Sequence, residues 1–274
     1  MNGSMQSDQR SASLDPDLPT IDLAGLSIHA ITEQHCVTHI IEALATARGG
    51  WVATPNLDHL RRLQSDSGFR EAYASASLRV ADGIPLLWAS RLQGTPLPGR
   101  VAGSDLISSL SAAAAKAGHS LFLLGGEPGS AEKAADALRR TSPSLQVVGT
   151  CCPRPGFERD PAQMAELEQQ LRTAAPDIIF VALGSPKQER FIAQMHELLP
   201  CSWWLGVGIS FSFLCGRVRR APPWMQRSGI EWIHRLWQEP GRLAKRYLLH
   251  GLPFALRLLT HSAWSGLRRR SDRT

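Results

Sequence analysis

The sequence predicts an α/β protein with a Rossmann-like, mainly parallel sheet, helices on both faces of that sheet, and a helical, basic C-terminal appendage. Short apolar runs alternate with longer amphipathic runs over residues 21–216, as in a parallel sheet with crossover helices. The amphipathic runs end at Gly or Pro, which are common helix stops. Residues 217–274 contain no strand-like run and are rich in Arg, Trp and Leu. We therefore expect a disordered lead-in over 1–20, a body over 21–216 and an appendage over 217–274.

The elements of the body follow in order from hydrophobic patterning. Amphipathic runs such as "TEQHCVTHIIEALATARG", "DLISSLSAAAAKAGH" and "KQERFIAQMHELLP" predict the helices between the strands. The candidate strands are Ile21–Ile28, Gly50–Thr54, Leu78–Ala81, Ser120–Leu124, Leu145–Gly149, Asp177–Val181 and Ser202–Val207.

The composition is that of an ordinary globular protein. The chain has 274 residues, of which 43% are hydrophobic and 20% charged, and this balance excludes an intrinsically disordered chain. The first twenty residues are polar and lack the apolar core of a secretory signal. The five cysteines are scattered, and the adjacent pair Cys151-Cys152 has the spacing of neither a zinc site nor a redox pair. We expect free thiols in a reducing cytoplasm.

The positive charge is concentrated at the C-terminus. The net charge is +6, but residues 217–274 hold 13 Lys and Arg against 3 Asp and Glu, so the rest of the chain is slightly acidic. Six of the eight tryptophans follow residue 200. The Leu-rich stretch Tyr247–Trp264 is interrupted by His, Pro and Arg, which disfavours a transmembrane helix.

The appendage allows three interpretations. A basic helix with Trp and Leu on its other face is typical of a segment that lies at an anionic membrane surface. The same apolar side chains could instead pack on the protein's own core, beneath a solvated basic face. The same charges could also bind nucleic acid. Charge pattern and composition favour the membrane surface, and we expect no nucleic-acid partner.

One carboxylate stands at a strand-to-helix junction. In "SLRVADGIPLLWAS", a short strand is followed by Asp82 and Gly83, and a helix then begins with Pro85 in its first turn. In open α/β sheets this edge is where ligands collect. On this stretch alone, a helix N-cap is the more common use of such an aspartate.

Other polar and glycine residues follow neighbouring strands. Each has an ordinary structural explanation, a tight turn or a helix start, and "LGGEPG" lacks the GxGxxG spacing of a dinucleotide fingerprint. Because the carboxyl ends of parallel strands meet at one edge, these residues could line one crevice with Asp82 as its base. The predicted lining is Thr54, Asn56, Asp82, Gly125, Gly126 and Gln188.

The chain resembles the WecG/TagA/CpsF family of bacterial glycosyltransferases (glycosyltransferase family 26) from about residue 21 to 247. The blocks that carry the resemblance are "TPN", "ADGIPLLWASRLQG", "RVAGSDL", "LGGEPG", "LGSPKQE" and above all "GRVRRAPPWMQRSGIEWIHRLWQEPGRLAKRY". The resemblance implies a Rossmann-like body that transfers a sugar, of the N-acetylmannosamine or hexose type, from a UDP-sugar to a polyprenyl-diphosphate-linked saccharide in cell-surface polysaccharide biosynthesis. It also implies inversion at the anomeric carbon, no metal or other cofactor, and a peripheral location on the cytoplasmic face of the membrane.

The resemblance also implies roles for single residues. Asp82 takes the place of the general base, and "GISFSF" has Ser212 where many relatives have an aspartate, so we assign no second catalytic carboxylate. Lys245 stands where the family pattern suggests an arginine, which would turn a bidentate phosphate contact into a point charge. The implied substrate-binding residues are Thr54, Asn56 and Gln188 in the body and Arg235, Arg242 and Lys245 in the appendage, which would close over the site.

The sequence leaves two other classes of protein function open. The α/β pattern also suits a dinucleotide-dependent Rossmann oxidoreductase, although its fingerprint is missing. A non-catalytic, membrane-associated binding protein is the second. The apolar surface of the appendage could also pack between subunits of a homo-oligomer.

Overall fold

The computed structural model describes residues 15–271, except for the side chains of Pro223, Arg227, Arg242, Arg246 and Arg270. Most of the predicted lead-in lies outside the described residues, and the chain joins the fold before residue 21. Asp15 lies 3.2 Å from His39 (Oδ2 to Nε2), and the first strand begins at Thr20.

The body is built on a six-stranded parallel sheet with the strand order β4-β3-β8-β7-β5-β6. The predicted α/β fold class is confirmed. Six of the seven candidate strands appear within a few residues of their expected bounds. The sheet strands are β3 (Gly50–Ala53), β4 (Leu78–Arg79), β5 (Ser120–Gly125), β6 (Gln146–Cys151), β7 (Ile178–Ala182) and β8 (Trp203–Gly206).

The remaining candidate, predicted as one strand over Ile21–Ile28, is two strands. β1 (Thr20–Leu23) and β2 (Leu26–His29) form an antiparallel hairpin outside the main sheet. Ala24 and Gly25 turn the chain with positive φ of 55° and 79°, the conformation that tight two-residue hairpin turns require. The apolar alternation changes phase at this turn, from Ile21 and Leu23 to Leu26 and Ile28, and the prediction of a single strand overlooked this change.

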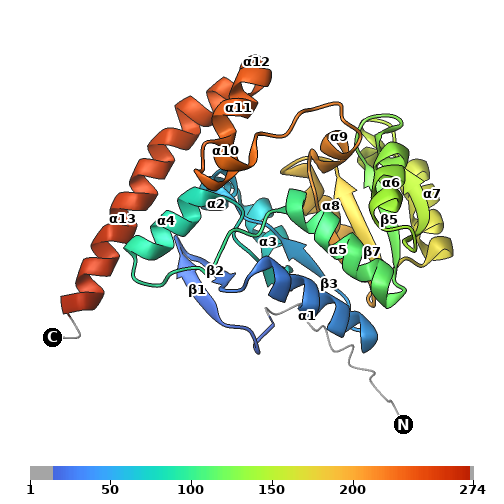
Figure 1. The fold of residues 1–274 in the computed structure, drawn as a ribbon, viewed down its shortest axis with the longest axis horizontal. Helices are drawn as coiled ribbons and strands as arrows, with labels where there is room; N and C mark the ends of the chain where they lie inside the picture. The colour runs from blue at the N-terminus through green and yellow to red at the C-terminus, as the bar shows by residue number, and fades with distance from the viewer. Residues whose placement is uncertain (1–14, 272–274) are drawn as a thin grey trace, which may run out of the picture.

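Helices cover both faces of the sheet (Figure 1). Because neighbouring strand residues point to opposite faces, Trp51 and Ala53 join one hydrophobic cluster and Val52 joins the other. Near-continuous apolar strands are expected where both faces are buried. One face carries α1 (Glu33–Ala45), α5 (Gly103–Ala117), α6 (Ser130–Thr141) and α9 (Ser210–Leu214), and the other carries α2 (Leu57–Ser65), α3 (Ser67–Ala74), α4 (Ile84–Leu92), α7 (Pro161–Ala174) and α8 (Lys187–Met195).

The described part of the appendage is helical, as predicted. Its longest helix, α13 (Leu252–Ser271), runs beside α4 (Figure 1). Phe254, Leu258, Ser262 and Gly266 of α13 are buried, and their spacing of four places them on one face of that helix. The appendage therefore packs on the body through a narrow stripe. Its elements are α10 (Pro223–Arg227), α11 (Glu231–Gln238), α12 (Pro240–Ala244), the π-helical segment η3 (Lys245–Gly251) and α13 (Leu252–Ser271).

Gly266 sets the distance between α13 and α4, which predicts that Gly266→Ala lowers stability. A Cβ added at Gly266 would overlap the carbonyl oxygen of Leu92, and overpacking of this kind costs about 1–3 kcal/mol. The matched control is Gly241→Ala in α12, where an added Cβ meets nothing within 4 Å. Thermal unfolding should show a lower Tm for Gly266→Ala and an unchanged or higher Tm for Gly241→Ala. Equal Tm values for the two variants would contradict this packing.

Candidate active site

Asp82 lies at the carboxyl edge of the sheet, beside the loop that follows β3. Its backbone N–H donates to the carbonyl of Pro55 at 2.8 Å. The interpretation of Asp82 as a helix cap is wrong, because the N-cap of α4 is Gly83, which has a φ of 132° and no side-chain cap bond. The carboxylate is therefore not used to hold the helix start.

Asn56 is both a structural and a candidate binding residue. Its side-chain oxygen accepts hydrogen bonds from the backbone N–H groups of Asp58 and His59, at 3.0 and 3.2 Å, and so caps α2. This cap fixes the side chain in one orientation, and the amide nitrogen takes no part in it. Asn56 also lies close to the Asp82 junction, since its Cβ is 4.0 Å from the position of a Cβ added at Gly83.

The carboxyl group of Asp82 is unusually basic. Its side chain keeps 29% of its surface exposed, but the surrounding protein removes enough water to raise its pKa from 3.8 to about 7. Glu231 and Asp105 also raise this pKa, whereas Arg100 and Arg235 lower it. A carboxylate with a pKa near neutral is suited to accept a proton during a reaction.

Asp82 belongs to a group of charged side chains that joins the body to the appendage. We call this group the arginine cluster: Asp82, Arg100, Asp105, Arg220 and Glu231. Arg100 Nη1 lies 4.0 Å from Asp82 Oδ1 and 3.4 Å from Glu231 Oε2, and its Nη2 lies 2.7 Å from Asp105 Oδ2. Arg220 pairs with Asp105 and approaches Glu231 Oε1 with its Nε at 3.9 Å. The appendage is thus connected by ion pairs to the neighbourhood of the candidate base.

Sequence reasoning assigned no role to the four partners of Asp82 in the arginine cluster. Two of them lie in the block "RVAGSDL" and two in the long appendage block. Both blocks carry the family resemblance, although neither residue pair was given a role. What the sequence does not show is that Arg100 meets a side chain 131 residues further along the chain.

Gln188 follows β7 and is buried, with 6% of its surface exposed. Its Nε2 donates to Glu189 Oε1 at 2.9 Å, and its Oε1 accepts from the Gly208 N–H at 3.1 Å. Glu189 in turn lies 3.9 Å from His59 Nε2, whose Nδ1 is 2.7 Å from the Tyr73 hydroxyl. These contacts fix the amide orientation of Gln188, which leaves one N–H as its remaining donor.

Thr54 and the two glycines belong to the same edge and are packed tightly. Thr54 is buried, and its Oγ1 is 3.7 Å from the position of a Cβ added at Gly103. Gly125 and Gly126 have φ of 93° and 81°, and a Cβ on Gly125 would lie 2.8 Å from the Ala182 carbonyl oxygen. The Gly126 N–H already donates to that same carbonyl at 2.8 Å, so it is not free to bind a phosphate. Both positions require glycine for their backbone conformation.

The three cations predicted in the appendage differ in their settings. Arg235 in α11 is half-buried, and its charge acts on Asp82. Lys245 begins η3 with an exposed side chain, and within residues 15–271 no ion pair joins it to the arginine cluster. Arg242 lies in α12, and its side chain is outside the described residues.

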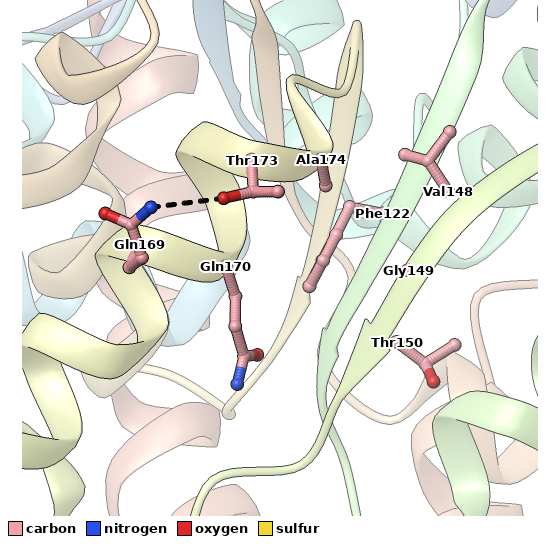
Figure 2. A pocket seen from close by; sticks show the side chains of 8 residues that line it. All are labelled: Phe122, Val148, Gly149, Thr150, Gln169, Gln170, Thr173 and Ala174. Carbon is pink, nitrogen blue, oxygen red and sulfur yellow. Dashed lines mark hydrogen bonds between the residues drawn. The ribbon is translucent and has the colours of Figure 1, made fainter.

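A groove of about 510 Å³ lies elsewhere, between β6 and α7 (Figure 2). None of the predicted site residues lines it. Its walls come from residues such as Phe122, Val148 and Gln170. In the described part of the chain, no three His, Cys, Asp or Glu side chains come together as a metal ion would require.

Comparison with models of known protein families gives a match over most of the chain. The model of the glycosyl transferase WecG/TagA/CpsF family matches residues 21–268. The match covers the body and nearly all of the appendage, including Asp82 and its four partners. The chain therefore belongs to the WecG/TagA/CpsF family of glycosyltransferases.

Proposed function

We propose that this glycosyltransferase moves a hexose or an N-acetylmannosamine-type sugar from a UDP-sugar to a polyprenyl-diphosphate-linked saccharide, with inversion. The acceptor would lie in the cytoplasmic face of the cell membrane, and the product would enter cell-surface polysaccharide synthesis. Family membership makes the chain a transferase and so disfavours the oxidoreductase alternative. The donor, the acceptor and the location are our proposals.

The observation that carries the proposal is the setting of Asp82. It is a carboxylate at the carboxyl edge of a parallel sheet, with a pKa raised to about 7, and it borders the positively charged appendage through Arg100. A base near neutrality can remove the acceptor's hydroxyl proton as that oxygen attacks.

In the proposed reaction, the ionised Asp82 accepts the proton of the acceptor hydroxyl. The acceptor oxygen forms a bond to the anomeric carbon on the face opposite the diphosphate. The bond between that carbon and the diphosphate oxygen breaks, and UDP departs with the electron pair. Transfer from the opposite face inverts the configuration at the anomeric carbon.

The departing diphosphate gains negative charge that must be stabilised. We propose that Arg100 and Arg235 supply this stabilisation, together with Arg242 and Lys245 when the appendage closes. No metal or other cofactor is expected. Thr54, Asn56 and Gln188 would contact the donor, and Gly125 and Gly126 would form the turn beside it.

The outer face of α13 supports membrane association. Its exposed apolar residues Leu252, Leu256 and Trp264 lie about two positions from the buried stripe, which places them on the opposite side of the helix. The exposed basic residues Arg257 and Arg268 lie next to this apolar face, with Arg268 over the ring of Trp264, as expected of a helix that binds anionic lipid. Within residues 15–271, no helix is both long and apolar enough to span a bilayer. We also expect that the appendage could contribute to a homo-oligomer.

The proposed function is tested by a UDP-release screen. UDP-hexoses and UDP-N-acetylhexosamines are assayed with and without a prenyl-diphosphate-linked acceptor in anionic vesicles. We expect one donor class to release UDP far faster with the acceptor present, and to yield a product of inverted configuration. The absence of acceptor-dependent release for every UDP-sugar, by a folded protein, would overturn the proposal.

A further inference from the structure

Glu231 is an acidic residue in a strongly basic segment. Within the described part of the appendage, 217–271, the acidic residues are Glu231 and Glu239. The Glu231 side chain is only 20% exposed and is directed at the body, with Oε2 at 3.4 Å from Arg100 Nη1. Glu231 thus brings a negative charge from the appendage to Arg100 of the body.

Glu231 and Asp82 face the same nitrogen of Arg100. That nitrogen, Nη1, lies 3.4 Å from Glu231 Oε2 and 4.0 Å from Asp82 Oδ1. The second distance is too long for a hydrogen bond. The other terminal nitrogen of Arg100 is held by Asp105 at 2.7 Å. Arg100 is therefore drawn toward Asp105 and Glu231, and Asp82 has no direct hydrogen bond with it.

The balance of charges in the arginine cluster also leaves Asp82 without a closely paired cation. The arginine cluster has three carboxylates, Asp82, Asp105 and Glu231, but two guanidinium groups, Arg100 and Arg220. If all three acids are ionised, the cluster holds one more negative than positive charge, and Arg235 acts on Asp82 without forming one of the ion pairs of the cluster. Arg220 is engaged by Asp105 and lies near Glu231, so Asp82 is the carboxylate with the weakest pairing.

We propose that Glu231 is a positioning residue that holds Arg100 away from Asp82 when the appendage docks, and so keeps the Asp82 carboxylate available as a base. This inference rests on the proposed role of Asp82. Without Glu231, Arg100 would be free to form a hydrogen-bonded ion pair with Asp82, and a carboxylate in such a pair is a weaker base. Docking of the appendage would then complete the site and also prepare its base.

The charged and titratable groups around Asp82 determine the direction in which its pKa moves when Glu231 is neutralised. Arg100 from the body and Arg235 from α11 lower the pKa of Asp82, whereas Glu231 and Asp105 raise it. Burial raises the pKa of the Tyr73 phenol, and the charges of Glu189 and Asp82 raise it further, so Tyr73 belongs to the same region. Neutralising Glu231 removes one raising charge and strengthens the effect of Arg100. Both changes lower the pKa of Asp82.

The test is the isosteric variant Glu231→Gln, followed by two independent measurements. The first is a ¹³C NMR titration of protein with labelled aspartate carboxyls, in which the Asp82 signal is assigned by its loss in Asp82→Asn. The second is the pH profile of kcat/KM. We expect the Asp82 titration and the acidic limb of the profile to move together to lower pH, by about one pH unit, and the plateau at high pH to fall. Glu231→Asp, which keeps the charge, should leave the Asp82 titration close to that of the wild type.

Glu127→Gln is the matched control. Glu127 forms another ion pair between body and appendage, with Arg217, and Glu127 is not among the groups that act on Asp82. The control should leave the Asp82 titration where it is. An Asp82 titration that stays unmoved in Glu231→Gln, as it does in the control, would overturn the inference.

The NMR measurement separates this inference from the proposed function. A lowered Asp82 titration in Glu231→Gln, in a protein that transfers no sugar, would support the positioning by Glu231 and refute the transferase proposal. An unchanged titration in an active transferase would refute the positioning and leave the transferase proposal standing.

Discussion

Replacing Asp82 by asparagine is expected to reduce turnover by about 1,000-fold while the protein remains folded. A positioned general base contributes about 10²–10⁴-fold to rate, and an amide of the same size cannot accept the proton. The measurement is UDP release at saturating donor and acceptor. UDP binding should change little, because the amide keeps the shape of the side chain.

The stability of Asp82→Asn provides an internal control. Since the pKa of Asp82 is about 7 in the folded protein and its ordinary value is 3.8, the folded state holds a proton between these pH values that the unfolded state has lost. Ionisation of Asp82 therefore lowers stability as pH rises through this range, and the asparagine variant escapes this cost. At pH 8 its Tm should equal or exceed that of the wild type, and the difference should shrink toward pH 4. A variant that retains full turnover, or one that is inactive only because it unfolds, would contradict the assigned role.

The second large effect is expected at the membrane. Replacing Leu252, Leu256 and Trp264 by glutamine should weaken binding to anionic vesicles by about 100-fold. These side chains are exposed on the outer face of α13, and removing each from a membrane interface costs about 1 kcal/mol or more. Vesicle co-sedimentation measures the effect, and added salt should weaken the remaining binding further.

The control for this variant lies at the other end of the sheet. Val148 is an exposed apolar residue of β6, and Val148→Gln should leave vesicle binding unchanged. Both proteins should keep the wild-type Tm, since none of the changed side chains is buried. Equal binding of the triple variant and the wild type would show that α13 does not face the membrane.

Most of the body was predictable because local patterns determine it. Apolar runs such as "IIFVA" in β7 and the Gly or Pro stops between elements reflect short-range physics that a sequence displays directly. The hairpin turn at Ala24 and Gly25 was missed because its signal is small, a shift of the apolar alternation by one position between β1 and β2.

The site was predictable in part, for a similar reason. The position of Asp82 follows from a strand, a carboxylate and a helix start in succession, which is a local signal. Its use as a cap was the wrong alternative because Gly83, at a φ of 132°, begins the helix one residue later. The partners Arg100, Asp105, Arg220 and Glu231 were not predictable, since only the folded chain brings them together.

The two sides of α13 also could not be assigned to their partners from the sequence. Composition predicted an amphipathic appendage and left open whether it packs on the body or on a membrane. The structure places Phe254 and Leu258 in the core and leaves Leu252 and Leu256 exposed. The helix therefore packs on the body with one stripe, and the opposite stripe supports our membrane proposal. Removal of residues 217–274 would also expose the surface of α4, which makes point variants the cleaner test.

The central claim is that the edge of the sheet at Asp82 and the appendage meet around one nucleotide-sugar. Hydrogen–deuterium exchange of the wild-type protein, with and without UDP, tests it most directly. We predict that UDP slows exchange both in the body segments 54–58 and 82–86 and in the appendage segment 231–245. Protection confined to the groove between β6 and α7, or protection of the body with no change in the appendage, would contradict it.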